Sequence, residues 1–437
     1  MVSNQRSVVI TGMGVVCPLG SDLSSLRSAL REGRSGIVPL TTLPAGDIGI
    51  TYGGEVPRFT GHISEFGEIS SDQKKQLRKS LKVMSREIQY AVASAQYALD
   101  HAGLHLGDLA PERVGTCFGS DYIATLPDEF VGPLRACSPL NGKIDFAEWT
   151  AKAMPQVNPL WLLKYLPNMP ASHIAIINDF RGPSNSITDR EASFNASIDC
   201  AARIIATGRA DAMLVGATGT RLHPVRTLQT LSQEEVAPAS LTPSEASRPF
   251  DRDRNGMVLG EGAGAIILEE EQLALRRGAT IHGRVIAAAV ACSRGRNRLA
   301  DRRQALGNAM RRTLLMGQVA PKEIGHVHAH GLGTRSCDTE EAAAIIDAFE
   351  EHGRDVPVVA LKSYTGNLGA GSGAVEFIAS ILALRDGRLF STLNYANPDS
   401  RCPLSVNTGI DTPSGDSFLN LSVSPQGQAA VVLTTRE

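Results

Sequence analysis

The chain has 437 residues, of which 42% are hydrophobic and 20% are charged, and its formal net charge is -2. This composition excludes an intrinsically disordered chain, which would carry fewer apolar residues and more net charge. The small net charge creates no overall field that would attract nucleic acid, so any electrostatic docking has to be local. We therefore expect a globular protein without a nucleic-acid partner.

Cysteine usage and apolar runs indicate the compartment. The seven cysteines are scattered, without a C-x-x-C pair, which argues against a disulfide framework or a zinc site. Residues 1–8 lack the apolar run of a signal peptide, and no segment approaches the ~20 apolar residues needed to span a bilayer. These features predict a cytoplasmic protein that has no membrane span, no bound metal and no other cofactor.

Predicted elements in the first half of the chain alternate between buried strands and helices. The apolar run over 7–16 ends in glycines and predicts a buried strand, which a helix over 21–30 follows. A helical pattern extends over 70–102, and Gly103 is its natural stop. Residues 121–180 contain Pro and Trp without a clean period, and we interpret them as an interface or lid region. The remaining elements are strands over 114–119, 212–216 and 260–268, a helix over 192–207 and a loop over 238–255.

The second half of the chain repeats this order of strand and helix. Pro357 directly precedes one of its strands, where a missing N–H does least harm. Two successive strand-helix halves predict a duplicated α/β unit, with an N-terminal half over 1–260 and a C-terminal half over 261–437. The predicted helices span 303–316, 339–350 and 372–384, and the predicted strands span 326–329, 358–361 and 428–433.

Five ordered sequence blocks give the chain a specific resemblance. They are Val8–Gly14, Arg181–Ile187, Ser247–Gly264, Ala329–Gly331 and Lys362–Gly366. With these blocks the sequence resembles, along nearly its whole length, the elongating β-ketoacyl-[acyl-carrier-protein] synthases of type II fatty acid and polyketide biosynthesis. The resemblance implies an α/β, thiolase-like fold, made of two similar halves in five α-β-α-β-α layers and usually dimeric.

The same resemblance implies positions for the catalytic residues. In that family a cysteine thiolate accepts the acyl group, and two histidines assist the decarboxylation of malonyl-carrier. The family's Thr-Ala-Cys stretch aligns without gaps onto Asp189-Arg190-Glu191, so Glu191 stands at the nucleophile position. The first histidine is retained as His330, whereas the second is replaced by Asn367.

Two further family positions are retained and one loop is rewritten. Lys362 keeps the family's lysine, and Glu376 keeps an acidic position on the following helix. The family's Phe-Gly-Phe-Gly-Gly loop, which supplies an oxyanion N–H and a gating phenylalanine, is replaced by Ser422–Gln426, where Pro425 removes a donor. These changes predict an active-site-degenerate member that resembles a chain-length factor and does not condense on its own.

A carboxylate at position 191 cannot take over the role of a thiolate in acyl transfer. It is a much poorer nucleophile toward a thioester, and the product would be a mixed anhydride. Ionised glutamate cannot donate a hydrogen bond to an enolate oxygen, and it would repel the malonyl carboxylate. We therefore interpret Glu191 as a structural plug that begins a buried helix. Its carboxylate is expected within ~4 Å of Lys362 or His330, or bound by backbone N–H groups.

Other residues are weaker candidates for chemistry. Cys200 and Cys337 could substitute for the missing nucleophile, although buried inert thiols are more common. The alternating histidines of His326–His330 share one strand face, but no second ligand cluster with metal spacing is evident. The glycine-rich stretches 331–333 and 366–373 match no dinucleotide or phosphate loop, which favours close packing as their role.

A basic cluster and the altered site together leave three functions open. Arg78, Lys79 and Lys82 match family positions that contact the acidic carrier protein, with a solvated helix face as the alternative. The favoured function is a subunit that resembles a chain-length factor, binds acyl carrier protein and forms a heterodimer with an active synthase. The alternatives are a malonyl-carrier decarboxylase or unusual acyltransferase, and a homodimeric acyl-binding or scaffold protein without turnover.

Overall fold

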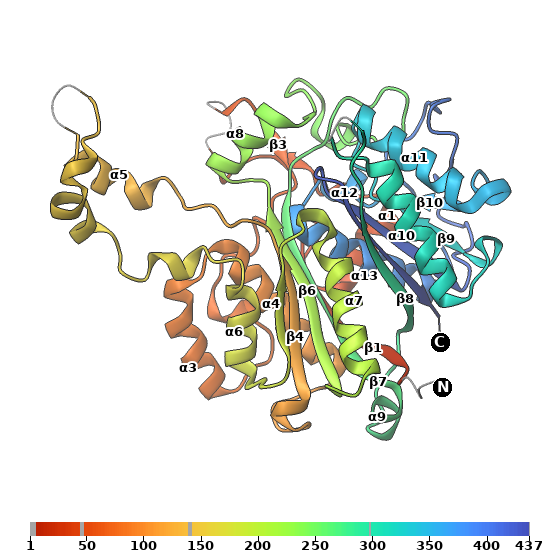
Figure 1. The fold of residues 1–437 in the computed structure, drawn as a ribbon, viewed down its shortest axis with the longest axis horizontal. Helices are drawn as coiled ribbons and strands as arrows, with labels where there is room; N and C mark the ends of the chain where they lie inside the picture. The colour runs from red at the N-terminus through yellow and green to blue at the C-terminus, as the bar shows by residue number, and fades with distance from the viewer. Residues whose placement is uncertain (1–5, 44–47, 139–141, 297–298, 437) are drawn as a thin grey trace.

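The computed structural model describes residues 6–43, 48–138, 142–296 and 299–436 (Figure 1). The first five residues of the predicted N-terminal segment lie outside this part of the chain. Its strands form one eleven-stranded sheet and a small ribbon of β2 (Val38–Pro39) and β3 (Tyr52–Gly53). None of the helices in these ranges combines the length and the apolar content that crossing a membrane requires.

The large sheet consists of two units with the same strand order. The N-terminal unit runs β1 (Val8–Val16), β7 (Glu261–Glu270), β6 (Ala212–Thr220), β4 (Val114–Ser120) and β5 (Ser184–Ile187). The C-terminal unit runs β8 (Gly283–Cys292), β13 (Gln428–Thr435), β12 (Ser417–Val423), β9 (His326–His328) and β10 (Pro357–Val359), with β11 (Ser405–Val406) at its edge.

Strand directions repeat together with the order. From β1 and from β8 outward, the first two neighbouring pairs are antiparallel and the next two are parallel. The two units join where Val8–Ile10 of β1 pairs with β8. The repetition shows two similar α/β units. Strand β7 belongs to the N-terminal unit, whereas the predicted boundary after residue 260 placed it in the C-terminal half.

Helices form three layers around the two sheet units. Two long helices, α7 (Ser193–Ala206) and α13 (Ser372–Asp386), lie between the units (Figure 1). The outer layers contain α4 (Arg86–Ala102) and α6 (Met169–Asn178) on the N-terminal unit, and α10 (Arg302–Gly317) and α11 (Arg335–Phe349) on the C-terminal unit. The arrangement is the predicted five-layer, thiolase-like α-β-α-β-α fold. The other α-helices whose residues are fully described are α1 (Leu23–Glu32), α3 (Ser71–Ser80), α5 (Asp128–Ala136), α8 (Pro224–Gln233), α9 (Glu271–Arg276) and α12 (Lys362–Thr365).

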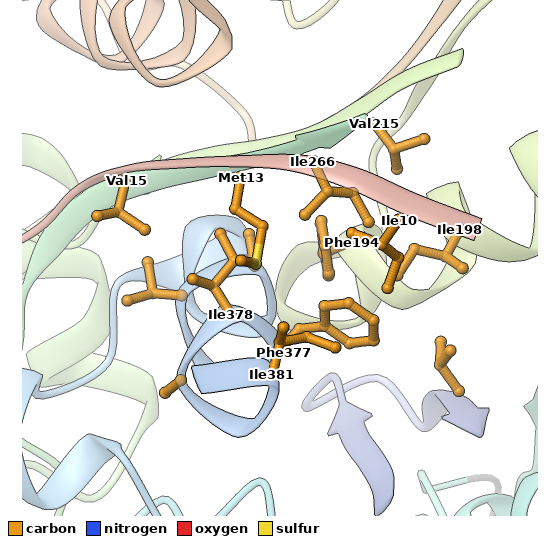
Figure 2. Packing of buried hydrophobic residues seen from close by; sticks show 14 of the residues in the cluster. Ile10, Met13, Val15, Phe194, Ile198, Val215, Ile266, Phe377, Ile378 and Ile381 are labelled. Carbon is orange, nitrogen blue, oxygen red and sulfur yellow. The ribbon is translucent and has the colours of Figure 1, made fainter. Parts of the chain in front are cut away.

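The central layer is packed with apolar side chains (Figure 2). Phe194 of α7 meets Phe377 of α13 edge to face, with the ring centroids 5.6 Å apart. Ile10 and Met13 of β1 belong to the same buried cluster. Because a close-packed core resists even small displacements, this packing fixes the start of α7 against α13.

Two predicted regions differ from the observed elements. The pattern over 70–102 forms two helices, because the chain is extended at Met84 and Ser85 caps α4 by accepting the N–H of Ile88. Strand β8 was not predicted, since its sequence is rich in alanine, which strands disfavour. The predicted stop at Gly103 is confirmed, and this residue adopts the left-handed conformation with a φ of 57°.

Residues 122–138 and 142–168, here called the arm, extend away from the layered body (Figure 1). Aromatic rings hold the arm together: Phe130 contacts Trp149 and Trp161, with ring centroids 6.3 and 5.2 Å away. Large apolar side chains nevertheless remain exposed. They are Tyr122, Leu126, Ile144, Phe146, Met154, Leu160 and Leu162. The arm therefore presents apolar surface that the rest of the described chain does not cover.

Candidate functional site

Glu191 lies where β5 leads into α7. Arg190 adopts a left-handed conformation with a φ of 53° and opens a 3-10 turn over Arg190–Ala192 that continues directly into the helix. Glu191 is buried, with 1% of its surface exposed. This agrees with the prediction of a buried side chain at the start of this helix, although the first turn is a 3-10 turn.

A guanidinium group and an amide bind the Glu191 carboxylate. Its Oε1 accepts hydrogen bonds from Nη2 of Arg221 and, at 3.1 Å, from Nδ2 of Asn367. The Nε atom of Arg190 lies 3.7 Å from Oε2. Oε2 is buried and has no hydrogen bond to any described residue. Arg221 was missed by the sequence-based prediction, which named Lys362 or His330 as the partner.

The two arginines determine the charge of Glu191. Burial opposes ionisation, but the positive charges of Arg221 and Arg190 outweigh burial and hold the pKa of Glu191 well below its ordinary value. Glu191 is therefore an anion at neutral pH. It accepts hydrogen bonds and has no hydrogen to donate.

Glu234 connects the same arginines. Its Oε1 accepts a hydrogen bond of 2.7 Å from Nη2 of Arg190 and lies 3.7 Å from Nη1 of Arg221. Two carboxylates and two guanidinium groups thus form a compact cluster of balanced charge, here called the charge tetrad (Glu191, Arg221, Glu234 and Arg190). The one signal in the sequence was Arg221 itself, a charged residue directly after the long buried strand β6.

Asn367, which aligns with the family's second histidine, also binds Glu191. Asn367 accepts the N–H of Gly369 at 3.0 Å and the hydroxyl of Ser372 at 3.2 Å through its Oδ1. Because Oδ1 accepts these two hydrogen bonds, Nδ2 is the amide atom that faces Glu191. The oxygen and the nitrogen of the amide cannot be exchanged without losing both bonds. The structure thus brings together Glu191 and Asn367, two residues that are far apart in the sequence.

His330, Lys362 and Glu376 form a neighbouring hydrogen-bonded group. Nζ of Lys362 lies 2.5 Å from Oε1 of Glu376, 2.6 Å from the carbonyl oxygen of His330 and 3.3 Å from Nδ1 of His330. Burial, together with the charge of Lys362, holds the pKa of His330 well below its ordinary value. The imidazole is neutral, and because an ammonium group only donates, the hydrogen bond assigns the ring hydrogen to Nε2.

The other histidines of the alternating run face α13. His326 and His328 both contact the hydroxyl of Ser380, at 3.0 and 2.8 Å. The free nitrogen of His326 lies 2.9 Å from the carbonyl oxygen of Ser414, and Leu361 donates its N–H to His328 at 3.4 Å. All four ring nitrogens are therefore engaged with the protein, which gives the alternation a structural role.

A cavity of about 250 Å³ lies beside Glu191 and His330. Cys337, one candidate substitute nucleophile, lines this cavity, but burial raises the pKa of its thiol well above the ordinary value. Cys200, the other candidate, does not line it and accepts a contact of 3.7 Å from Asn185. The rest of the lining runs from buried to exposed residues: Gln233, Glu234, Glu235, Arg302, Leu332, Thr334, Ser336, Val423 and Pro425.

Comparison with known proteins identifies this arrangement. Residues 5–274 match the family model of the β-ketoacyl synthase N-terminal domain, and residues 282–396 match that of the C-terminal domain. This chain belongs to the β-ketoacyl synthase family. It is 31% identical over 422 residues to a 3-oxoacyl-[acyl-carrier-protein] synthase 2 of Synechocystis sp., and the match covers 95% of each chain.

Solved structures of β-ketoacyl synthases have the same fold. The ishigamide ketosynthase/chain length factor is 28% identical and superposes with a TM-score of 0.83, over 99% of this chain and 100% of that one. A β-ketoacyl synthase from Burkholderia phymatum is 26% identical, with a TM-score of 0.84 over 99% and 100% of the two chains. The thiolase-like fold expected from the sequence is therefore confirmed.

A second group of buried charges lies in the interior of this β-ketoacyl synthase homologue. Nη2 of Arg226 lies 2.5 Å from Oδ2 of Asp121, and both residues are buried. A Cβ on Gly369 would lie 3.6 Å from Arg221 and 3.8 Å from Asp121, so this group adjoins the charge tetrad. Burial, together with the charge of Asp121, raises the pKa of the neighbouring Glu87 to about 8. Charged side chains thus fill the interior next to Glu191.

Two loops of the β-ketoacyl synthase homologue contribute to the site by close packing. A Cβ on Gly371 would lie 2.2 Å from the carbonyl oxygen of Gly262, which explains the glycine-rich stretch over 366–373. The rewritten loop begins as the end of β12 and turns at Pro425, which lines the cavity. Because proline has no backbone N–H, Pro425 offers no donor at the cavity wall.

The basic cluster lies apart from these residues. Arg78 and Lys79 are in the last turn of α3, and Lys82 is in the 3-10 turn that follows. All three are exposed, and none of them lines the cavity beside Glu191. The structure therefore places the predicted carrier contacts on the surface of the β-ketoacyl synthase homologue.

Proposed function

We propose that this β-ketoacyl synthase homologue is a non-condensing subunit that pairs with an active synthase and binds acyl carrier protein, in the manner of a chain-length factor. The observation that carries this proposal is the ionised Glu191 at the aligned nucleophile position. Asn367 at the second-histidine position and Pro425 in the rewritten loop add to it.

The bonding of Glu191 opposes covalent catalysis. A carboxylate with a strongly lowered pKa is a weak base and a weak nucleophile. Its Oε1 is held by Arg221 and Asn367, and attack on a thioester would neutralise the carboxylate and deprive the buried Arg221 of its main partner. Removing one partner of a buried ion pair costs about 3–5 kcal/mol. That cost would be added to the barrier of an already unfavourable anhydride formation.

The charges behind Glu191 also oppose the entry of an acyl chain into this subunit. Burial of an alkyl chain contributes about 0.8 kcal/mol per methylene. Roughly four to six buried methylenes would therefore only offset the about 3–5 kcal/mol lost when one buried ion pair is broken. We expect the acyl chain to lie in the active synthase or at the shared interface.

Two surface features support a partner subunit. The arm exposes seven large apolar side chains, and exposed apolar patches of this kind mark interaction sites. Strand β5 ends the sheet, and its Ser184 and Asn185 are exposed. An uncovered edge strand offers unpaired backbone groups to another chain. Both features lie in the N-terminal half of the molecule.

The alternatives differ in their support. A malonyl-carrier decarboxylase or unusual acyltransferase is disfavoured, because the anionic Glu191 repels the malonyl carboxylate and cannot donate to an enolate oxygen. A homodimeric scaffold without turnover is favoured by one observation, the charge-filled interior beside Glu191. Co-purification together with an acyl-transfer assay distinguishes the two alternatives.

The test combines co-purification with an acyl-transfer assay. We expect a heterodimer with an intact Cys-His-His synthase from the same genome, and condensation that requires both chains. Alone, this chain should form no covalent adduct with radiolabelled acyl-carrier. Such an adduct, or carbon–carbon bond formation by this chain alone, would overturn the proposal. Conversion of malonyl-carrier to acetyl-carrier that Glu191→Ala abolishes would favour the decarboxylase, and self-association under every condition would favour the scaffold.

A further inference from the structure

Two thiol groups lie side by side where α7 packs on β4. Cys117 is on β4 and is buried, and Cys200 is on α7 and is partly exposed. Cys117 donates a hydrogen bond to the sulfur of Cys200. The scattered cysteines of the sequence gave no sign of this pair, because the contact arises only where the helix meets the sheet.

The spacing of residues on both elements directs the two thiols toward each other. On β4, residues 117 and 119 share one face. On α7, residues 193, 197 and 200 share one face. A Cβ on Gly119 would lie 2.7 Å from the Cβ of Ser193, so the two faces are in close contact. The helix runs back along the strand from this point, which brings Cys200 to Cys117.

Asn185 places Cys200 near the edge of the sheet. It pairs with Cys117 in the register of β5 and β4, and its Nδ2 donates to Sγ of Cys200 at 3.7 Å. Strand β5 is the edge strand of the N-terminal unit, and Asn185 is exposed on it. A small oxidant in solution can therefore approach Cys200 from this edge, whereas Cys117 is shielded by burial.

The surroundings give the two sulfurs different roles. The hydrogen bond from Cys117, with a smaller contribution from Asn185, outweighs burial and lowers the pKa of Cys200. The same hydrogen bond, together with burial, raises the pKa of Cys117. The thiolate is the form of cysteine that reacts with oxidants. Cys200 is thus the sulfur that reacts first, and Cys117 is the thiol in position to follow.

We propose that Cys117 and Cys200 are a redox-sensitive pair, which a hydroperoxide oxidises to a disulfide in the chain whose β5 edge is uncovered. In the first step the Cys200 thiolate attacks the peroxide, the O–O bond breaks, and a sulfenic acid forms while an alkoxide leaves and takes up the thiol proton. In the second step the sulfur of Cys117 attacks that of Cys200. The S–S bond forms, and hydroxide leaves with the Cys117 proton as water. The pair loses two electrons and two protons, and the hydroperoxide is reduced to an alcohol and water.

The position of the pair connects its oxidation to assembly. The disulfide would join β4, the neighbour of the edge strand, to the helix that follows Glu191. A partner chain that covers β5 would close the approach to Cys200. Oxidation is therefore expected in the free subunit and not in the complex. This second part rests on the proposed pairing with a synthase, whereas the disulfide of the free chain does not.

The experiment treats the isolated full chain with hydrogen peroxide and maps its peptides by mass spectrometry without reduction. We expect a cross-linked peptide that contains Cys117 and Cys200, formed at least about threefold faster than the exposed Cys292 is oxidised. Dithiothreitol should restore both thiols. Oxidation of Cys292 while Cys117 and Cys200 stay reduced overturns the inference, and so does a disulfide that contains only one of the pair.

Two variants separate the pair from general oxidation. Cys200→Ser should abolish the cross-link and leave the buried Cys117 reduced. Cys292→Ser, a change of the same kind at an exposed residue on β8, should leave the rate of cross-linking within about twofold. Oxidation of Cys117 at the native rate in Cys200→Ser contradicts the assigned order of the two sulfurs. The mapping of the native chain does not depend on the folding of either variant.

The complex with the partner synthase tests the connection to assembly. The cross-link should form at least about tenfold more slowly in the complex than in the isolated chain, because susceptibility to peroxide follows exposure. Equal rates overturn the protection by the partner. Failure to form any complex contradicts the proposed function itself and leaves the disulfide of the isolated chain as a separate result.

Discussion

At the scale of single residues, the charge tetrad makes each member depend on the others. Glu191 and Arg221 each have 2% of their side chain exposed. Water cannot reach these buried side chains to solvate them. Removing one member of the tetrad therefore leaves an oppositely charged side chain unpaired in the interior. Removing two opposite charges leaves the cluster balanced again.

This dependence leads to a prediction for Arg221. Arg221→Met should lower the free energy of unfolding by roughly 3–5 kcal/mol, because Glu191 loses its main partner. The double variant Glu191→Gln with Arg221→Met should lose less than the sum of the single variants. Urea denaturation of the four proteins in the cycle measures this difference. Arg203→Met, which removes a guanidinium group whose side chain is 58% exposed, is the control and should cost under about 1 kcal/mol. Strictly additive losses would contradict the tetrad.

The raised pKa of Glu87 leads to the prediction that the free energy of unfolding depends on pH. Its pKa is raised from 4.5 to about 8 in the folded chain, so the folded state holds a proton that the unfolded state releases above its ordinary pKa. The contribution of this proton to the stability of the folded state is complete below pH 4.5 and is lost as the pH rises through about 8. Glu87→Gln should therefore gain stability relative to the native chain over this range, by at most about 1.4 kcal/mol per pH unit.

Urea unfolding at pH 5, 6.5 and 8 is the measurement for Glu87→Gln. Glu245→Gln is the control, because its side chain is 61% exposed and its neighbour Arg248 keeps its charge over this pH range. The difference between Glu87→Gln and the native chain should grow steadily with pH, and that of the control should stay constant. A difference that does not change with pH would show that Glu87 is not buried as a carboxylic acid.

At the scale of elements, α13 organises the histidines of β9. Glu376 and Ser380 are one helical turn apart on α13 and face the same neighbour. Glu376 binds Lys362, which in turn contacts His330, while Ser380 binds His326 and His328. One face of a single helix thus positions every member of the alternating run.

Removal of the Ser380 hydroxyl tests this arrangement. Ser380→Ala should lower the free energy of unfolding by about 1–3 kcal/mol, because two buried ring nitrogens lose their partner. Ser232→Ala on α8, an exposed serine, should change stability by under about 0.5 kcal/mol. Chemical denaturation gives both values. A loss equal to that of the control would mean that the histidines repair their bonds elsewhere.

The sequence predicted elements with strong periodicity and missed those without it. The buried strands over 7–16 and 114–119 and the helix over 192–207 are confirmed, because apolar runs and helical spacing are local properties. Strand β8 was missed, since alanine favours no strand by itself and is held there by pairing with β1 and β13. Local pattern cannot reveal such long-range pairing.

The same distinction holds for the site. Alignment with a family placed Glu191, His330 and Asn367, whose side chains the structure brings to one region of the interior. Arg221 and Glu234 were not predicted, because their role depends on where two loops meet in space and not on spacing along the chain. The charge of Glu191 could therefore not be derived from the sequence, which fixes the residue but not its neighbours.

At the scale of the whole molecule, the arm and the basic cluster are the two surfaces on which association depends. Phe146 is 68% exposed and Met154 is 56% exposed on the arm. If the arm contacts the partner subunit, a charge at these positions has to be desolvated in the complex. Exposed positions of this kind tolerate substitution in the isolated chain.

Phe146→Glu and Met154→Glu should therefore weaken the complex with an active synthase by about tenfold or more while leaving the Tm of the isolated chain within about 2 °C. Size-exclusion chromatography with light scattering gives the assembly state, and calorimetry gives the Tm. Leu315→Glu, at a position that is 79% exposed on α10 and far from the arm in sequence, is the control. Unchanged association in both arm variants would exclude the arm from the interface.

The basic cluster predicts a different signature. Changing Arg78, Lys79 and Lys82 together to Glu should weaken carrier binding by about tenfold or more at low salt and flatten its dependence on ionic strength. Titrations at two salt concentrations measure both effects. Arg312, Lys322 and Arg388 are exposed and lie elsewhere in the sequence, and their joint change to Glu, which shifts the net charge by the same amount, is the control. Equal losses in both variants would assign the effect to overall charge.

The repeated strand order has a consequence for position 191 that is independent of its side chain. Equivalent placement of α7 and α13 brings their first turns together, so that a Cβ on Gly373 would lie 3.6 Å from the carbonyl oxygen of Glu191. Each helix start carries roughly half a positive elementary charge. Both helix starts therefore favour negative charge near position 191, in addition to the charges of Arg221 and Arg190. This contribution comes from the duplicated backbone, so it should persist in any variant at position 191 that keeps the two helices in place.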